Sequence, residues 1–308
     1  MKLTSLRAVF LIAVSTVSFG QASSGIKGVV ADGVRPELVQ EGFKFTEGPV
    51  GTADGGLFFS DIMGGDKTYR LDPGGKILPY RSATNGTNGL ALMRDGSLIG
   101  AEGDGKKVSK AGPNGAAATV TAGPAGNGLM APNDLIADGK DGIYFTDPGP
   151  RPIVPGRKTY VYYLRKGAAQ PAVLDDSITR PNGLTLTNNG KLLIVDDTVG
   201  DAVFAFDVQA DGSVKNKRPF AKLHDVQTGQ ESGADGMAID SEDRIYVSTS
   251  SGIQVFDAKG VYLGTIKGPR QPANCAFSGP GKRTLFITAR EGLYKVAMLS
   301  RGPQRLGK

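Results

Sequence analysis

The chain has 308 residues, and its 45 glycines are about twice the usual ~7% share. It carries a formal net charge of +6, no tryptophan, one cysteine and one histidine. The single cysteine, Cys275, excludes an intrachain disulfide and a cysteine-based zinc cluster, and we expect it to be a buried apolar side chain. The single histidine, His224, excludes a three-histidine metal site. Any metal in this protein must therefore be held by oxygen ligands.

The start of the chain predicts an export signal. Lys2 and Arg7 flank a basic start, the apolar run Ala8–Ser18 follows, and Gly20-Gln21-Ala22 is a small-x-small cleavage pattern. The apolar run is too short to span a bilayer. We expect residues 1–22 to be a signal peptide and the protein to be secreted or periplasmic.

Charge predicts little about partners. Removal of the signal takes away two positive charges and leaves a net charge of +4. The lysines and arginines are scattered along the chain rather than clustered, so no nucleic-acid partner is predicted. We expect a monomer without a membrane span that acts on a small molecule.

One strand pattern recurs six times in the rest of the chain. Each copy has a turn with Asp or Gly, then a β-branched or aromatic run, then a small or acidic residue. The six copies are Gly55–Asp61, Asp95–Ala101, Asp141–Asp147, Gly190–Asp196, Asp243–Thr249 and Lys282–Ala289. Other short apolar runs, such as Tyr160–Leu164, lie between the copies, and no stretch shows sustained helical periodicity.

The spacing of this pattern predicts the fold. Successive copies end 40 to 53 residues apart, and repeats of this length with several short strands are typical of a β-propeller. A blade buries neither face alone, and closure of the ring hides sheet edges, while glycine supplies positive φ in the turns. We therefore predict an all-β, six-bladed β-propeller with four-stranded antiparallel blades around a central channel, formed by residues 23–308 as one domain. A pair of β-sandwiches is the alternative.

A second repeated feature lies just before these strands. It is a short motif in which Asn, Asp or Glu stands beside Gly, Pro or Asp. Equivalent positions in successive blades face the same channel, so we expect Glu47, Asn133, Asn182 and Asp235 to converge. Two carboxylates and two amide oxygens suit Ca²⁺, Mg²⁺ or Mn²⁺. Asn88 has the same place in the second copy and is, with Asn133, a candidate for substrate binding.

Each of these residues also has a purely structural interpretation. Asn182-Gly183 and Asp235-Gly236 are common turn dipeptides, and Glu47 is equally consistent with a solvated loop carboxylate. Recurrence at one position, followed by an apolar residue, favours a channel site. Glu102 is a further candidate for the channel wall on position alone, and His224, in a polar loop, is expected to be exposed.

These motifs resemble those of the gluconolactonase/regucalcin-like family, the sugar lactone lactonases. The resemblance runs from about Glu37 to Lys295. It is carried by Phe45–Pro49 with Gly56–Asp61, Pro132–Asp134 with Tyr144–Pro148, Arg180–Gly183, and Ala234–Met237. It implies a six-bladed propeller with one divalent cation in the channel, Ca²⁺ in the first place, with Zn²⁺, Mg²⁺, Mn²⁺ and Fe²⁺ as alternatives.

The resemblance also implies roles for particular residues. Glu47, Asn182 and Asp235 are implied as metal ligands, Asn133 as a residue at the metal or the substrate, and Asp235 as the acid/base residue. The family reaction is hydrolysis of sugar lactones. A divalent ion can polarise the ester carbonyl, while a carboxylate takes the proton of the attacking water and passes it to the ring oxygen. This chemistry requires neither a histidine nor a serine nucleophile.

We therefore expect a metal-dependent lactonase that acts on a small lactone. Two alternatives remain, a propeller phosphotriesterase with a similar calcium site and a non-catalytic propeller that binds a ligand. Two positions depart from the family pattern. Ala131 stands where some members have an arginine that can contact the sugar, and Gly51 stands where a tryptophan is common. Both departures bear on the identity of the substrate more than on metal binding.

Overall fold

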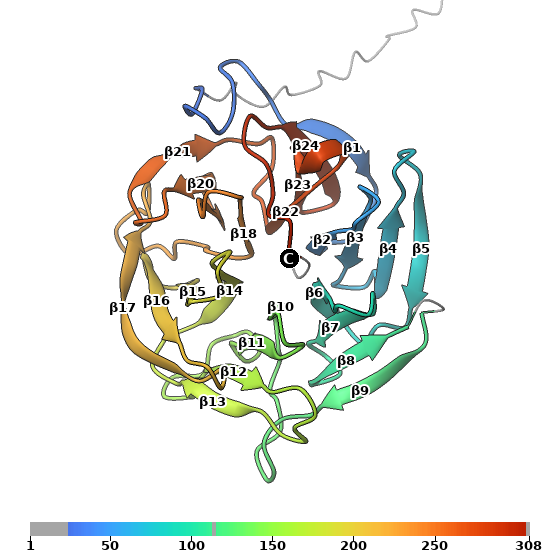
Figure 1. Cartoon of the computed structure of the whole chain (residues 1–308), viewed down its shortest axis with the longest axis vertical. Helices are drawn as coiled ribbons and strands as arrows, with labels where there is room; N and C mark the ends of the chain where they lie inside the picture. The colour runs from blue at the N-terminus through green and yellow to red at the C-terminus, as the bar shows by residue number, and fades with distance from the viewer. Residues whose placement is uncertain (1–23, 113–114, 306–308) are drawn as a thin grey trace, which may run out of the picture.

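The described part of the chain forms a ring of six antiparallel sheets of four strands each (Figure 1). The structure is a computed structural model that describes residues 24–112 and 115–305. The predicted six-bladed β-propeller is thus confirmed. Within the described ranges the one helical element is a short 3₁₀ turn, η1 (Pro280–Lys282), and no helix there is long and apolar enough to cross a membrane. The predicted signal peptide, residues 1–22, lies outside the described residues.

Every blade runs from an inner strand that lines the channel to an outer strand at the rim (Figure 1). The inner strands are β2 (Thr46–Gly51), β6 (Thr87–Leu92), β10 (Leu135–Ala137), β14 (Pro181–Leu186), β18 (Met237–Ile239) and β22 (Asn274–Ser278). The second strands are β3 (Leu57–Asp61), β7 (Leu98–Glu102), β11 (Ile143–Asp147), β15 (Leu192–Asp197), β19 (Ile245–Thr249) and β23 (Thr284–Ala289). The second strands coincide with the six repeated segments of the sequence.

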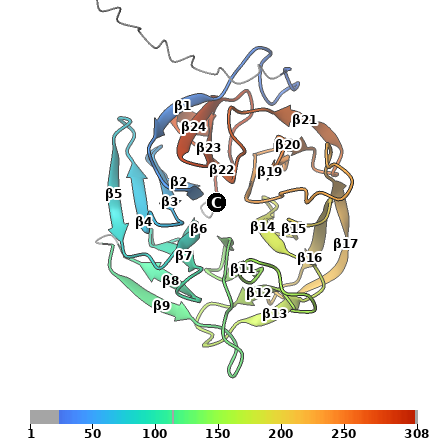
Figure 2. The ribbon, with the colours of Figure 1, turned by 180° about the vertical axis from the view of Figure 1, so that it is seen from behind.

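The outer half of each blade completes the ring. The third strands are β4 (Lys67–Leu71), β8 (Lys107–Ala111), β12 (Tyr160–Leu164), β16 (Ala202–Val208), β20 (Gly252–Phe256) and β24 (Gly292–Ala297). The outer strands of the first five blades are β5 (Ile77–Ser82), β9 (Ala117–Thr121), β13 (Ala172–Asp175), β17 (Val214–Lys222) and β21 (Tyr262–Ile266). The sixth blade takes its outer strand, β1 (Glu37–Glu41), from the N-terminal side of the chain, where it pairs antiparallel with β24 (Figure 2). This pairing joins the first and last blades and covers the edge of β24.

A hydrophobic cluster fills each of the six interfaces between neighbouring blades. Along β11, Tyr144 packs with Leu184 of the fourth blade, whereas Phe145 packs with Ile99 of the second blade. Successive side chains of a strand point to opposite faces of its sheet. Both faces are buried here, which explains the continuous apolar runs in the sequence. Cys275 lies in one of these clusters and is fully buried, as predicted.

The last described residues lie at the end of the channel opposite the starts of the inner strands. The Nζ of Lys282, in the sixth blade, donates to the carbonyl oxygen of Pro303 at 2.5 Å. The guanidinium of Arg305 donates to the carbonyl oxygen of Leu186, at the end of β14, at 2.6 Å. Burial lowers the pKa of Arg305 to about 10. This segment therefore bridges the sixth and fourth blades and leaves the other end of the channel for the site.

Candidate active site in the central channel

The predicted site residues occupy equivalent positions at the starts of five inner strands. Glu47, Asn88 and Asn182 are each the second residue of their strand, in β2, β6 and β14. Asn133 and Asp235 lie two residues before β10 and β18. The inner strands surround one channel (Figure 1), so the fold gathers these five residues at the same end of it.

The backbone contacts confirm that these positions are equivalent. The N–H of Asn133 donates to the carbonyl oxygen of Thr146 at 2.9 Å, and the N–H of Asp235 donates to that of Ser248 at 3.0 Å. Both acceptors lie on the second strand of the same blade, so the two site residues pair with their blades in the same way. Asn182 is itself part of β14, which excludes the interpretation of Asn182-Gly183 as a simple turn.

Glycine after the site residue lets neighbouring inner strands approach closely. A Cβ on Gly183 would lie 2.0 Å from the carbonyl oxygen of Asp235, and a Cβ on Gly236 would lie 1.7 Å from Cγ of Asn274. Both distances are far below van der Waals contact, so a side chain at Gly183 would push neighbouring strands apart, and one at Gly236 would displace the side chain of Asn274. The glycines of the sequence motif thus set the spacing of the channel wall.

Asn274, in the sixth blade, belongs to this layer and was not predicted from the sequence. It is the first residue of β22, is 1% exposed, and accepts the N–H of Cys275 on its Oδ1 at 2.8 Å. Its side chain fills the space above Gly236. A sequence signal was present, since an asparagine does precede the repeated strand. It was missed because Cys275, rather than Gly or Pro, follows it.

Carboxylates concentrate around Asp235. Burial raises the pKa of Asp235 well above its usual value, and the negative charges of Glu47, Asp196 and Asp134 raise it further. A hydrogen bond from the Asn182 side chain acts in the opposite direction. Those three neighbouring carboxylates are at most 2% exposed, whereas Asp235 keeps some exposure to the channel. A cation would relieve this repulsion, because it favours the ionised form of each carboxyl group.

The donor set fits a hard divalent cation. The Oδ1 of Asn182 is buried, and no hydrogen-bond donor among the described residues reaches it. The Nδ2 of the same amide donates to Oγ1 of Thr198 at 3.1 Å, which orients the group. A buried acceptor without a donor is costly, and an amide oxygen is a common ligand of Ca²⁺. Glu47 and Asp235 add carboxylate oxygens to this set.

A metal site here depends on that amide oxygen. In the part of the chain that the structure describes, no three Asp, Glu, His or Cys side chains form a metal-binding group by themselves. The Oδ1 of Asn88 is likewise buried and lacks a donor among the described residues. The oxygen atoms available for a cation are therefore a mixture of carboxylate and amide oxygens, and the predicted metal site stays a prediction.

The acidic ends of three second strands hold the segments that lead to the site. Each carboxylate accepts a backbone N–H two residues before a site residue. The three bonds join Asp61 to Phe45 (2.9 Å), Asp147 to Ala131 (2.9 Å) and Asp197 to Arg180 (3.0 Å). Glu47, Asn133 and Asn182 are thus positioned by fixed backbone rather than by flexible loops.

The side chains of two other residues considered from the sequence, Glu102 and His224, make contacts outside the channel site. The fully buried carboxylate of Glu102 binds Arg81 at 2.8 Å, Asn85 at 2.9 Å and Lys107 at 3.4 Å. These contacts leave it a structural role between the first two blades. His224 is exposed, as predicted, and stacks on Tyr262 with the ring centroids 3.9 Å apart.

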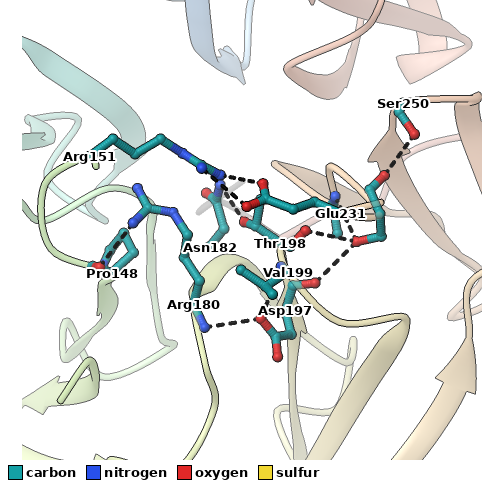
Figure 3. A network of polar contacts seen from close by, with 11 residues as sticks. Pro148, Arg151, Arg180, Asn182, Asp197, Thr198, Val199, Glu231 and Ser250 are labelled. Atoms are coloured by element: carbon teal, nitrogen blue, oxygen red, sulfur yellow. Dashed lines mark hydrogen bonds and ion pairs between the residues drawn. The ribbon is translucent and has the colours of Figure 1, made fainter. Parts of the chain in front are cut away.

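Two arginines lie at the same end of the channel (Figure 3). Arg180 precedes Asn182 by two residues, and Arg151 comes from the loop between β11 and β12. The pKa of Arg151 is raised, chiefly by its hydrogen bond to Glu231, and that of Arg180 is lowered, chiefly by burial, while the negative charge of Asp235 acts on both groups as a smaller influence. The channel end therefore combines an acidic cluster with a cationic rim.

Comparison with known proteins identifies similar chains. The family model "SMP-30/Gluconolactonase/LRE-like region" matches residues 45–291. A gluconolactonase of Zymomonas mobilis is 28% identical over 288 residues, which cover 84% of this chain and 80% of that protein. The lactonase drp35 of Staphylococcus haemolyticus is 27% identical over 76% of this chain and 72% of its own length.

Solved structures give the same result. A gluconolactonase from Xanthomonas campestris superposes with a TM-score of 0.79 at 26% identity and covers 90% of this chain and 94% of its own. The regucalcin of Agrobacterium tumefaciens, at 18% identity and a TM-score of 0.74, shares the fold. The resemblance noted in the sequence is confirmed, and the chain belongs to the SMP-30/Gluconolactonase/LRE-like family.

Proposed function

We propose that this protein is a lactone hydrolase that depends on one divalent cation. The observation that carries the proposal is the buried Oδ1 of Asn182, which lacks a donor among the described residues and belongs to an amide group that donates a hydrogen bond to the carboxyl group of Asp235. The names of the relatives from Zymomonas and Staphylococcus, a gluconolactonase and a lactonase, support a lactone as the substrate. Sugar lactones such as gluconolactone are the first candidates.

Three residues would hold the ion. Glu47 and Asp235 supply carboxylate oxygens, and Asn182 supplies an amide oxygen. Ca²⁺ is our first choice because it accepts such mixed oxygen ligands in flexible geometry, and Zn²⁺, Mg²⁺, Mn²⁺ and Fe²⁺ are the alternatives. When bound, the ion would polarise the lactone carbonyl as a Lewis acid and lower the pKa of nearby water.

Asp235 is the residue for proton transfer. Its side chain keeps some exposure to the channel, whereas Glu47 is buried, so its carboxylate can reach a water molecule there and accept a proton. The carboxylate takes a proton from the water whose oxygen attacks the lactone carbonyl carbon. As the bond between that carbon and the ring oxygen breaks, the proton passes to the ring oxygen, and the product is a hydroxy acid.

Two further residues would orient the substrate. Asn133 and Asn88 occupy the same layer as the proposed ligands, on neighbouring blades. The N–H of Gly89 donates to the carbonyl oxygen of Asn133 at 2.8 Å and joins the backbones of these two blades. Their amide groups can donate and accept hydrogen bonds with the hydroxyl groups of a sugar lactone. Replacing either one by alanine should raise KM more than it lowers kcat.

The experiment is a panel of lactones assayed in EDTA and then with each divalent ion added back. We expect EDTA to abolish hydrolysis and at least one ion to restore it, and Asp235→Asn to remain inactive although it unfolds cooperatively. Full hydrolysis in EDTA would contradict the metal dependence. Faster turnover of a phosphotriester than of any lactone would instead favour a phosphotriesterase.

The cellular location is a separate part of the proposal. The basic start and apolar run of residues 1–22 support export to the periplasm or the medium. We propose that the mature protein acts there as a monomer. Cell fractionation with N-terminal sequencing of the mature chain tests the location, and light scattering tests the oligomeric state.

A further inference from the structure

The side chain of Arg180 is buried at the mouth of the candidate site, and its backbone is fixed on both sides. The N–H of Arg180 donates to Oδ1 of Asp197 at 3.0 Å, and its carbonyl oxygen accepts the N–H of Thr198 at 3.0 Å. The residue is only 8% exposed. Because Asn182 follows two residues later, the guanidinium is held in a set position relative to the proposed metal ligands.

The guanidinium of Arg180 has no carboxylate partner. Its single hydrogen bond to a protein atom among the described residues goes from Nη1 to the carbonyl oxygen of Pro148 at 3.2 Å, and no described carboxylate lies within ion-pair distance of it (Figure 3). The other N–H donors of the group therefore have no described protein acceptor. These donors are not among the fully buried side-chain atoms that lack a partner, so they remain open to the channel. This group is thus arranged to receive an anion from outside the chain.

Of the two carboxylates whose charges act on Arg180, Glu231 is already paired with the second arginine. Glu231 accepts two hydrogen bonds from Arg151, at 3.2 and 2.6 Å. Both side chains of that pair are at least 40% exposed. Burial lowers the pKa of Arg180, and the positive charge of Arg151 lowers it further. The channel mouth therefore has two guanidinium groups and one carboxylate, and that carboxylate is paired with Arg151 rather than with Arg180.

The acidic cluster around Asp235 does not neutralise the positive charge of Arg180. In the proposed function Glu47 and Asp235 bind a divalent cation, which balances their charges. The positive charge of Arg180 then remains without an ion-pair partner among the described residues, at the end of the channel where the proposed ligands lie. An anionic group of the substrate would pair with this charge, because a guanidinium binds a carboxylate or a phosphate through two parallel hydrogen bonds.

We propose that Arg180 binds an anionic group of the substrate, and that the preferred substrates are lactones that carry a carboxylate or a phosphate away from the lactone carbonyl. This inference rests on the proposed function and narrows its substrate class. Arg151 is partly exposed and adds a second positive charge at the rim, although its pairing with Glu231 gives it the smaller effect. Arg180 is a specificity residue in this account and has no part in the proton transfer.

The test compares three lactones of similar size. Gluconolactone is neutral, glucarolactone carries a carboxylate, and phosphogluconolactone carries a phosphate. We expect kcat/KM to be at least about tenfold higher for one of the charged lactones than for gluconolactone. Comparison of glucarolactone with phosphogluconolactone shows whether the site prefers a carboxylate or a phosphate. Arg180→Gln should lower kcat/KM for the preferred charged lactone by roughly 10- to 100-fold, mainly through KM, and by less than about threefold for gluconolactone.

Two further variants serve as controls. Arg180→Lys keeps the positive charge but loses the paired hydrogen bonds, so we expect a partial loss on the charged lactone. Arg151→Gln removes the same charge from the exposed rim and should have a smaller effect than Arg180→Gln. Equal losses on neutral and charged lactones in Arg180→Gln would overturn the inference, because Arg180 would then only balance the charge of the site.

A binding measurement keeps the inference separate from turnover. Calorimetry on the wild-type protein should show that glucarate, with a second carboxylate, or phosphogluconate, with a phosphate, binds at least about tenfold more tightly than gluconate, and that salt weakens the difference. Equal binding of all three would overturn the inference and leave the hydrolase intact. Tighter binding of either one that requires Arg180, in a protein that hydrolyses no lactone, would overturn the hydrolase and leave the anion site intact.

Discussion

The carboxylate of Asp61 accepts the backbone N–H of Phe45 at 2.9 Å and thereby fixes the chain two residues before Glu47. The same Oδ1 accepts the N–H of Lys44 at 2.8 Å. Asp147 makes the same contact with the segment before Asn133, so the acidic end of a second strand positions the site residue of its own blade.

Asp61→Ala should destabilise the fold. The variant leaves the N–H groups of Lys44 and Phe45 without their acceptor, and Asp61 is only 4% exposed. We expect the free energy of unfolding to fall by about 1–3 kcal/mol, measured by urea denaturation. Asp61→Asn keeps an oxygen acceptor and should lose clearly less. Equal losses in the two variants would contradict the hydrogen-bonding role.

Gly183→Ala should disturb both stability and the site. The added methyl group would lie 2.0 Å from the carbonyl oxygen of Asp235, so β14 and the segment before β18 must separate. We expect a loss of about 1–3 kcal/mol and of most lactone hydrolysis. Gly139→Ala is the matched control, since a Cβ there meets no atom within 4 Å. Wild-type stability and turnover in Gly183→Ala would show that the strands can separate without consequence.

Asp235→Asn should stabilise the metal-free protein while it removes activity. The pKa of Asp235 is raised in the folded state above 3.8, by burial first and then by the neighbouring carboxylates. The folded state therefore binds this proton more tightly than the unfolded state does. As the pH rises from the unfolded-state pKa through the raised folded-state pKa, this group lowers stability, and its full cost is present above the folded-state value.

Thermal unfolding in EDTA across the acidic to neutral range measures this effect. Asp235→Asn lacks the ionisation, so we expect the chelated variant to be at least as stable as the wild type at neutral pH. A divalent ion should raise the melting temperature of the wild type and leave that of the variant unchanged. A chelated variant that is clearly less stable than the wild type at neutral pH would contradict the electrostatic origin of the raised pKa.

Removal of residues 24–41 should open the ring. The third strand of the last blade, β24, would lose its partner β1, and its edge would become exposed. We expect the shortened chain to lose cooperative unfolding. We also expect it to associate as its concentration rises, which light scattering measures. Glu37→Gln is the control, because it breaks only the exposed ion pair with Lys295 and should change little. A shortened chain that melts like the wild type would contradict the closing role of β1.

Much of this architecture could be predicted from the sequence. The segment Asp141–Asp147 predicted β11 because both faces of a blade are buried, so the strand appears as a continuous apolar run between turn residues. Asn182 and Asp235 could be found because their motifs recur at one blade position. The ring arrangement then brings them together without any local sequence signal.

Other features depend on contacts between distant segments. The strand Glu37–Glu41 is largely exposed and has no apolar pattern, so its pairing with the last blade was not visible. Asn274 was missed because its neighbour breaks the motif. Arg151 and Glu231 meet from loops of different blades, and no spacing in the sequence encodes the 2.6 Å contact between them.

Metal content and lactone hydrolysis, measured on the same samples, test the central claim most directly. The samples are the wild type, Glu47→Gln and Asn182→Ala, each shown to unfold cooperatively. We predict a single divalent ion per chain in the wild type, and a parallel loss of ion and hydrolysis in both variants. Full lactone hydrolysis by samples that contain no divalent metal would contradict it.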